Sequence, residues 1–260
     1  MPLPRALLLA AAITLVPAST ALASHSQVSV FEDDVNLQVN PAGTLAQMRL
    51  LGANQVRVAV RWQLVAPKPT SRKRPKHFNA ANPADYPAAS WAIYDAIVTQ
   101  AKAEGITPNF DLLGGSPIWA TGPGAPRDGR PHFNWSPNPT DFGKFAQAVA
   151  TRYSGNYNAA THKLDPGNKN DLPRVSLWSV WNEPDYGPSL APQGVRGNLK
   201  VENSPRMYRN LVDATYTALK QTGHGRDRLM FGELAPRGAE NWGVFSGMKP
   251  LIFLDRKSVV

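Results

Sequence analysis

The sequence predicts an α/β fold, namely an incomplete (β/α)8 barrel in which about five of the eight strand–helix units are present. Strand patterns alternate with helix patterns along the 260 residues, which is typical of a parallel sheet. The long irregular loops follow the strands, and this is the end where such barrels build active sites. No Gly-x-Gly-x-x-Gly or Gly-x4-Gly-Lys-Ser/Thr motif is present, which disfavours a nucleotide-binding sheet.

The first units are indicated by changes in apolar spacing. We expect a strand at 28–31 that continues through Val35 and Leu37. Leu45, Met48 and Leu51 then recur at helical spacing. Strict alternation of valines predicts the second strand at 55–62. The same criteria predict helices at 91–104, 140–153 and 204–222, and strands at 106–113, 175–181 and 228–233.

Both ends of the chain are expected to lie outside this domain. Residues 1–23 have a positively charged N-terminal region, an apolar run of 11 residues and, at their end, the pattern of small residues that signal peptidase cleaves. We therefore expect a secretory signal and a secreted protein. Residues 24–254 are expected to form the partial barrel domain. Residues 255–260 resemble the translation of a sequencing adapter, and we interpret them as a non-native tail that replaces the rest of the protein after Leu254; a natural polar C-terminus is the alternative.

Composition excludes several classes of site. The absence of cysteine excludes disulfides, thiolate zinc sites and cysteine nucleophiles, and the five histidines are scattered, so we expect no metal and no cofactor. The net charge is +9, with a basic cluster in the loop 68–76. This loop is either simply solvated or in contact with an anionic wall polymer. We expect no nucleic-acid partner and, once the signal is cleaved, no membrane association; the oligomeric state stays open.

The strongest chemical signal is Trp181-Asn182-Glu183-Pro184, directly after the predicted fourth strand. A carboxylate at the C-terminal tip of a barrel strand is held rigidly, and loops around it exclude water. Glycoside hydrolysis needs such a group, because a carboxylic acid must protonate the leaving oxygen. A surface carboxylate in a turn made by Pro184 is the alternative.

The segment Leu-Trp-Ser-Val-Trp-Asn-Glu-Pro-Asp-Tyr, 177–186, resembles the fourth-strand signature of clan A glycoside hydrolases, which include cellulase-like and β-xylosidase-like families. The resemblance implies a carbohydrate substrate, with Glu183 as acid/base and Asn182 on the sugar 2-hydroxyl. It places the nucleophile on a seventh strand, which the predicted elements do not reach. We therefore expect the 260-residue chain itself to be inactive.

Further candidates lie near other strand tips. The resemblance puts an arginine near the second strand to orient the nucleophile, and both Arg57 and Arg61 qualify; a salt bridge inside the barrel is the alternative. Glu233 ends the predicted fifth strand and is a subsite candidate, with a purely structural role as the alternative. Acidic residues 32–34 follow the first strand as cleft floor or as an acidic turn. We expect a sugar-binding wall made of Trp119, Trp135 and Tyr186, and a core position for Trp178 and Trp62.

The function predicted is that of a secreted glycoside hydrolase that cleaves O-glycosidic bonds of a poly- or oligosaccharide with retention. The alternatives are a non-catalytic carbohydrate-binding protein on the same scaffold and a wall-binding protein that uses the basic loop. The sugar, the linkage and exo or endo action are not encoded in these motifs.

Overall fold

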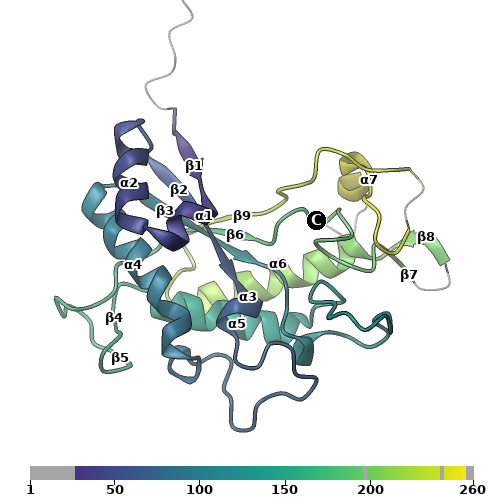
Figure 1. Ribbon diagram of the computed structural model, residues 1–260, viewed down its shortest axis with the longest axis horizontal. Helices are drawn as coiled ribbons and strands as arrows, with labels where there is room; N and C mark the ends of the chain where they lie inside the picture. Colours follow the sequence, from purple (N-terminus) through teal and green to yellow (C-terminus); the bar gives the residue numbers. More distant parts are fainter. Residues whose placement is uncertain (1–26, 196–197, 241–242, 256–260) are drawn as a thin grey trace, which may run out of the picture.

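The computed structural model describes residues 27–195, 198–240 and 243–255. The predicted signal 1–23 and the tail residues 256–260 lie outside this part of the chain. One parallel sheet has its strands in chain order: β1 (Val30–Glu32), β2 (Gln55–Arg61), β3 (Thr107–Leu113), β6 (Leu177–Val180) and β9 (Arg228–Met230). The α/β class is confirmed. Within the described residues β1 and β9 are both edges, so the barrel is incomplete (Figure 1).

Helices fill the connections between these strands. The long ones are α2 (Pro41–Leu50), α4 (Ala88–Glu104), α5 (Pro139–Arg152) and α6 (Ser204–Gln221). Shorter elements are α1 (Asp34–Val39), α3 (Trp62–Val65), α7 (Pro250–Asp255) and the 3-10 turns η1 (Pro83–Asp85) and η2 (Ile118–Ala120). Two small antiparallel pairs join β4 (Tyr157–Asn158) to β5 (Lys163–Leu164) and β7 (Gly194–Val195) to β8 (Asn198–Glu202). No helix in the described ranges is long and apolar enough to cross a membrane.

The predicted extension of the first strand through Val35 and Leu37 is wrong, because this segment is helix α1. Its alternation resembles a strand, yet Val35 is 75% exposed and Leu37 is buried. The Asp33 carboxylate accepts a hydrogen bond from the backbone N–H of Asn36 and so caps the helix. The cap supplies the local hydrogen bond that turns the chain away from the sheet.

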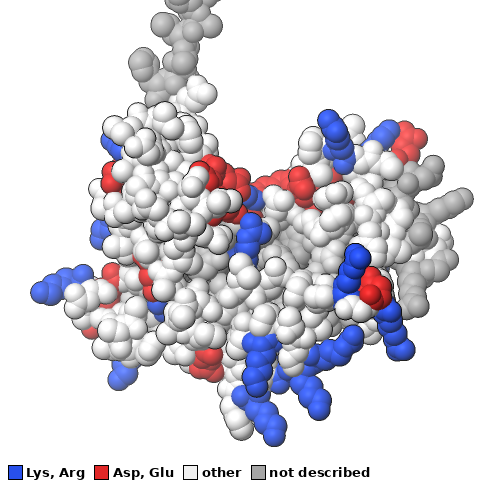
Figure 2. Space-filling view, in the orientation of Figure 1, with Lys and Arg blue, Asp and Glu red and all other residues white. Residues whose placement is uncertain are grey.

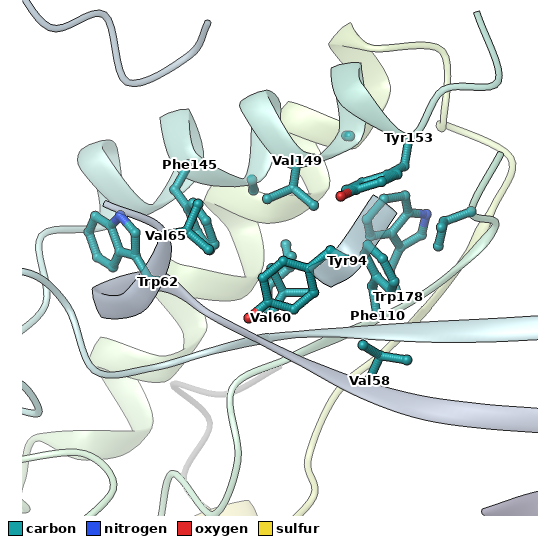
Figure 3. Packing of buried hydrophobic residues seen from close by; sticks show 14 of the residues in the cluster. Val58, Val60, Trp62, Val65, Tyr94, Phe110, Phe145, Val149, Tyr153 and Trp178 are labelled. Atoms are coloured by element: carbon teal, nitrogen blue, oxygen red, sulfur yellow. The ribbon is translucent and has the colours of Figure 1, made fainter. Parts of the chain in front are cut away.

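Helix α5 shows how local sequence fixes a helix and its buried face. Asn138 caps it by accepting the N–H of Asp141, so the helix starts slightly before the predicted residue 140, with Pro139 at its first position. Phe145 and Val149 lie one turn apart on the side that faces the sheet (Figure 3).

The hydrophobic core lies between the sheet and helices α4 and α5. Phe145, Val149 and Tyr153 point from α5 toward Trp62, Val60, Phe110 and Trp178 (Figure 3). Trp62 stacks on Phe145 with ring centroids 5.7 Å apart. As expected, Trp62 and Trp178 are fully buried. Burying an aromatic side chain contributes about 2–3 kcal/mol, so these contacts hold the strand tips that carry the site.

The other face of the sheet is polar near its centre. The strand register places Ala59, Asp111 and Ser179 in one row, because adjacent parallel strands pair these positions. Residues two apart share a face, so Arg57 and Asn109 belong to this side as well. Asn109 and Ser179 are buried, and Asn109 Nδ2 lies 3.4 Å from Ser179 Oγ. Buried polar groups lower the stability of the fold unless they are hydrogen-bonded. The side chain of Arg57 lies on the same face and is a potential partner for them.

Candidate active site at the C-terminal ends of the strands

Arg57 links the tips of four strands. Its Nη1 donates to Glu32, the last residue of β1. Its Nη2 lies 2.8 Å from Asp111 Oδ2 on β3, 3.1 Å from Asn182 Oδ1 after β6 and 2.6 Å from Glu233 Oε2 after β9. Two of the predicted site residues, Asn182 and Glu233, are thus brought onto one guanidinium nitrogen.

The charge of this cluster is unbalanced. Three carboxyl groups surround one guanidinium, and the Asp111 side chain has no exposed surface. Burial raises the pKa of Asp111 well above its usual value; Arg57 opposes this, and the neighbouring Glu233 and Glu32 add to it. Burial lowers the pKa of Arg57, but its carboxylate partners outweigh this and raise it, so the arginine stays charged. Acidic groups border the notch beside β9 with a basic group among them (Figure 2).

The turn after β6 is rigid and strained. Trp181 has φ +62, an uncommon value for a bulky residue. Its N–H donates to Leu112 O and its indole N–H to Ser189 O, at 3.0 and 3.2 Å. The ring packs against Gly114, where a Cβ would lie 2.1 Å from a ring carbon. These contacts fix the backbone that presents Asn182 and Glu183.

Glu183 and Glu233 are neighbours across the strand tips. The N–H of Glu183 donates to the carbonyl of Glu233 at 3.0 Å. Both residues adopt left-handed backbone, with φ +48 and +44. Strained backbone at non-glycine residues concentrates at functional sites, because surrounding contacts must hold it there. The half-buried Glu183 side chain makes no hydrogen bond or ion pair to any described residue, whereas Glu233 is held by Arg57.

Two buried residues that the sequence argument missed brace these tips. Asp185 accepts the N–H of Ala235 at 2.8 Å, and its backbone carbonyl accepts from Met248. Burial raises the pKa of Asp185 to about 6. Tyr208 on α6 donates to the carbonyl of Val180 and accepts from the N–H of Gly232. Asp111, also missed, had a signal: it is the lone charged residue in the predicted strand 106–113.

The second arginine candidate lies away from the cluster. Arg61 donates to Asp34 at 2.8 Å and keeps about a third of its side chain exposed. With Asn182, Gly114 and Asn134 it lines a cavity of about 400 Å³. Arg57 therefore gathers three carboxyl groups from different strands, whereas Arg61 pairs with one.

The predicted aromatic wall divides between two places. Trp119 and Trp135 line a larger cavity, of about 1150 Å³, under the loops that follow β2 and β3. Their indole N–H groups are bound by the carbonyls of Pro67 and Pro123, so both rings are fixed. Tyr186 lies after β6 and is 41% exposed. In the described part of the chain, no three His, Cys, Asp or Glu residues are arranged to hold a metal ion.

No known protein family matches the sequence, and no curated protein matches it significantly. Solved structures that resemble this one include the β-glucosidase from Trichoderma harzianum (19% identity, TM-score 0.46), Fpglu1 from Fervidobacterium (19%, 0.49) and a family 1 β-glucosidase from Thermotoga maritima (14%, 0.42). These alignments cover 75%, 76% and 73% of this chain. The chain spans only 36–40% of the length of those proteins.

Proposed function

We propose that this chain carries the acid/base side of the active site of a secreted, retaining glycoside hydrolase. The observation that carries the proposal is the state of Glu183. It lies at the tip of β6 beside Asn182, and its carboxylate makes no hydrogen bond or ion pair to a described residue. Its acidic neighbours are engaged: Glu32, Asp111 and Glu233 contact Arg57.

A carboxyl group in this position is suited to proton transfer. It is half-buried and fixed by the turn, yet it remains free to meet a glycosidic oxygen. In the retaining mechanism, Glu183 protonates the leaving oxygen while a second carboxylate attacks the anomeric carbon. It then takes a proton from the water that hydrolyses the glycosyl-enzyme. Asn182 binds the sugar 2-hydroxyl.

The nucleophile is proposed to come from chain beyond residue 254. Glu233 is the nearest second carboxylate, but Arg57 and the backbone of Glu183 hold it, and we assign it to a subsite. Export rests on the predicted signal 1–23. Sequencing the gene through its 3′ end tests the origin of the nucleophile. Sequencing the N-terminus of the mature protein tests the cleavage of the signal. A carboxylate on a seventh strand and a start at Ser24 are expected.

Activity measurements on the protein encoded by the full gene test the role of Glu183. Glu183→Ala should abolish cleavage of natural oligosaccharides but affect the first step less for activated aryl glycosides, whose leaving groups need little protonation. Azide should then restore turnover and give a glycosyl azide of retained configuration. Asp213→Ala is the matched control, since Asp213 is a carboxylate on α6 with 68% of its side chain exposed.

Residual activity of Glu183→Ala within about threefold of wild type, which is under ~1 kcal/mol of barrier, contradicts the acid/base assignment. Saccharide binding without turnover in the full-length protein would instead favour a non-catalytic carbohydrate-binding protein.

A further inference from the structure

The large cavity under the loops after β2 and β3 is strongly basic. Arg72, Arg127 and Arg130 line it together with His132, and no Asp or Glu is among its lining residues. The three arginines are exposed, and none of their guanidinium groups makes an ion pair or hydrogen bond to a described residue, although the backbone N–H of Arg130 donates to Asp128. Lys and Arg side chains gather along the lower edge of the molecule, where Figure 1 draws these loops (Figure 2).

The position of this positive charge is fixed by other residues. Arg74 pairs with Asp141 in the first turn of α5, and its guanidinium lies 5.1 Å from the ring of Trp119. This anchors the basic loop close to Arg72. On the other side, His132 pairs with Asp128 at 2.9 Å and stacks on Phe245, with ring centroids 5.5 Å apart. The cavity is therefore a built surface rather than a solvated run of charge.

Aromatic rings line the same cavity. Trp119 is partly buried, and Phe245 is 37% exposed. A pyranose ring presents a C–H face that stacks on such rings, and guanidinium groups bind carboxylates with paired hydrogen bonds. Rings and free arginines together match a sugar that carries a carboxylate.

The basic cavity is adjacent to the cavity at the candidate active site. Pro131 lines both this cavity and the smaller one that reaches Asn182. Pro131 thus places the cavity of Arg127 and Arg130 next to the one that reaches Asn182. The volume of about 1150 Å³ lies above the range of roughly 300–1,000 Å³ for single small-molecule pockets, which fits a chain of several units.

We infer that this cavity binds an acidic saccharide, one whose uronate carboxylates are held by Arg72, Arg127 and Arg130. The inference deepens the proposed function, on which it rests for the saccharide nature of the ligand. It makes a uronate-containing chain, and not a neutral glucan, the preferred ligand.

Calorimetric titration tests this on the Glu183→Gln protein, which leaves the ligand intact. The probes are an oligogalacturonate, its methyl ester, a cello-oligosaccharide, a sulfated cello-oligosaccharide and a single-stranded DNA of equal charge. The free acid should bind at least about tenfold more tightly than its ester, and salt should weaken it. Arg127→Gln/Arg130→Gln should remove that preference. Arg49→Gln, which changes an exposed arginine on α2, should keep it.

Three results would overturn the inference: equal affinity for acid and ester, an unchanged Kd in the double arginine variant with intact thermal unfolding, or tighter binding of the sulfated saccharide or the DNA. Failure of the proposed function is distinguishable. If the full-length wild type binds the acidic saccharide in a charge-dependent way but has no turnover, the cavity assignment holds and the hydrolase proposal fails. If Glu183→Ala loses turnover but the protein shows no preference for uronate, the hydrolase proposal holds and the cavity assignment fails.

Discussion

Arg57 Nη2 lies 2.8 Å from Oδ2 of Asp111, a carboxyl group with no exposed surface whose other oxygen has no hydrogen-bond partner in the described structure. The pair joins β2 to β3 under the strand tips. A buried ion pair adds little net stability, but removal of one partner leaves an uncompensated buried group.

Substitutions of the two residues should therefore lower the free energy of unfolding by different amounts. Arg57→Met should lower the free energy of unfolding by about 3–5 kcal/mol, because Asp111 loses its cation. Asp111→Asn should cost less, since burial already favours the neutral form. Urea unfolding measures both, and Arg57→Met/Asp111→Leu should recover part of the loss. A cost below about 1 kcal/mol for Arg57→Met would show that the pair does not hold these strands.

Tyr208 provides a second test, because its hydroxyl bridges the ends of β6 and β9. Tyr208→Phe leaves the carbonyl of Val180 and the N–H of Gly232 without this partner, at about 1–3 kcal/mol. Tyr216→Phe is the control on the same helix, since Tyr216 is 51% exposed. The melting temperature of Tyr208→Phe should be clearly lower than that of Tyr216→Phe. Equal melting temperatures would mean that the bridge contributes nothing.

Gly114 tests the support of the Trp181 turn. Gly114→Ala places a Cβ 2.1 Å from the Trp181 ring, so the ring must move, at a cost of about 1–3 kcal/mol. Gly225→Ala is the matched change, since its nearest contact is the flexible Lys220 side chain at 3.3 Å. Near-ultraviolet circular dichroism should report a moved tryptophan in the first variant only. An unchanged spectrum with unchanged stability would show that the turn tolerates a side chain here.

Asp185 should make stability depend on pH in a defined window. Burial raises its pKa to about 6 from the ordinary 3.8, so the folded protein keeps a proton that the unfolded chain has lost between these values. The free energy of unfolding should therefore fall as pH rises through this window, by up to about 3 kcal/mol from this group.

Asp185→Asn keeps an oxygen for the N–H of Ala235 and cannot lose a proton. Its stability relative to wild type should rise between pH 4 and 6 and then level off. Denaturation at several pH values measures this difference, in which the contribution of Asp111 cancels. A difference that is flat across the window would refute the raised pKa of Asp185.

Helices and strands with a clear local periodicity of apolar residues can be predicted from the sequence. Strand β2 follows from the alternation of Val56, Val58 and Val60, and α5 from its helical apolar spacing. The pattern of Val35 and Leu37 misleads, because a capping carboxylate at Asp33 outweighs the alternation of two apolar residues. Element type thus follows from periodicity except where one side-chain hydrogen bond decides it.

The candidate site was only partly predictable for a different reason. Glu183, Asn182 and Glu233 follow strands directly, so position alone selects them. The role of Arg57 depends on partners 54, 125 and 176 residues away, and local patterns do not contain such pairings. Tyr208 was missed because its significance comes only from what it contacts, whereas Asp111 had a local signal as the lone charge of its strand.

The strand order has a consequence for how the protein is made. Each strand pairs with the one synthesised before it, so the sheet can assemble as the chain emerges from the ribosome. Only 25 residues separate Val30 from its partner Gln55, whereas 68 separate Asn109 from Leu177. Closing the longer connection costs about 0.9 kcal/mol more chain entropy. Addition of β6, which carries Glu183 at its end, is therefore the entropically most expensive step of sheet growth.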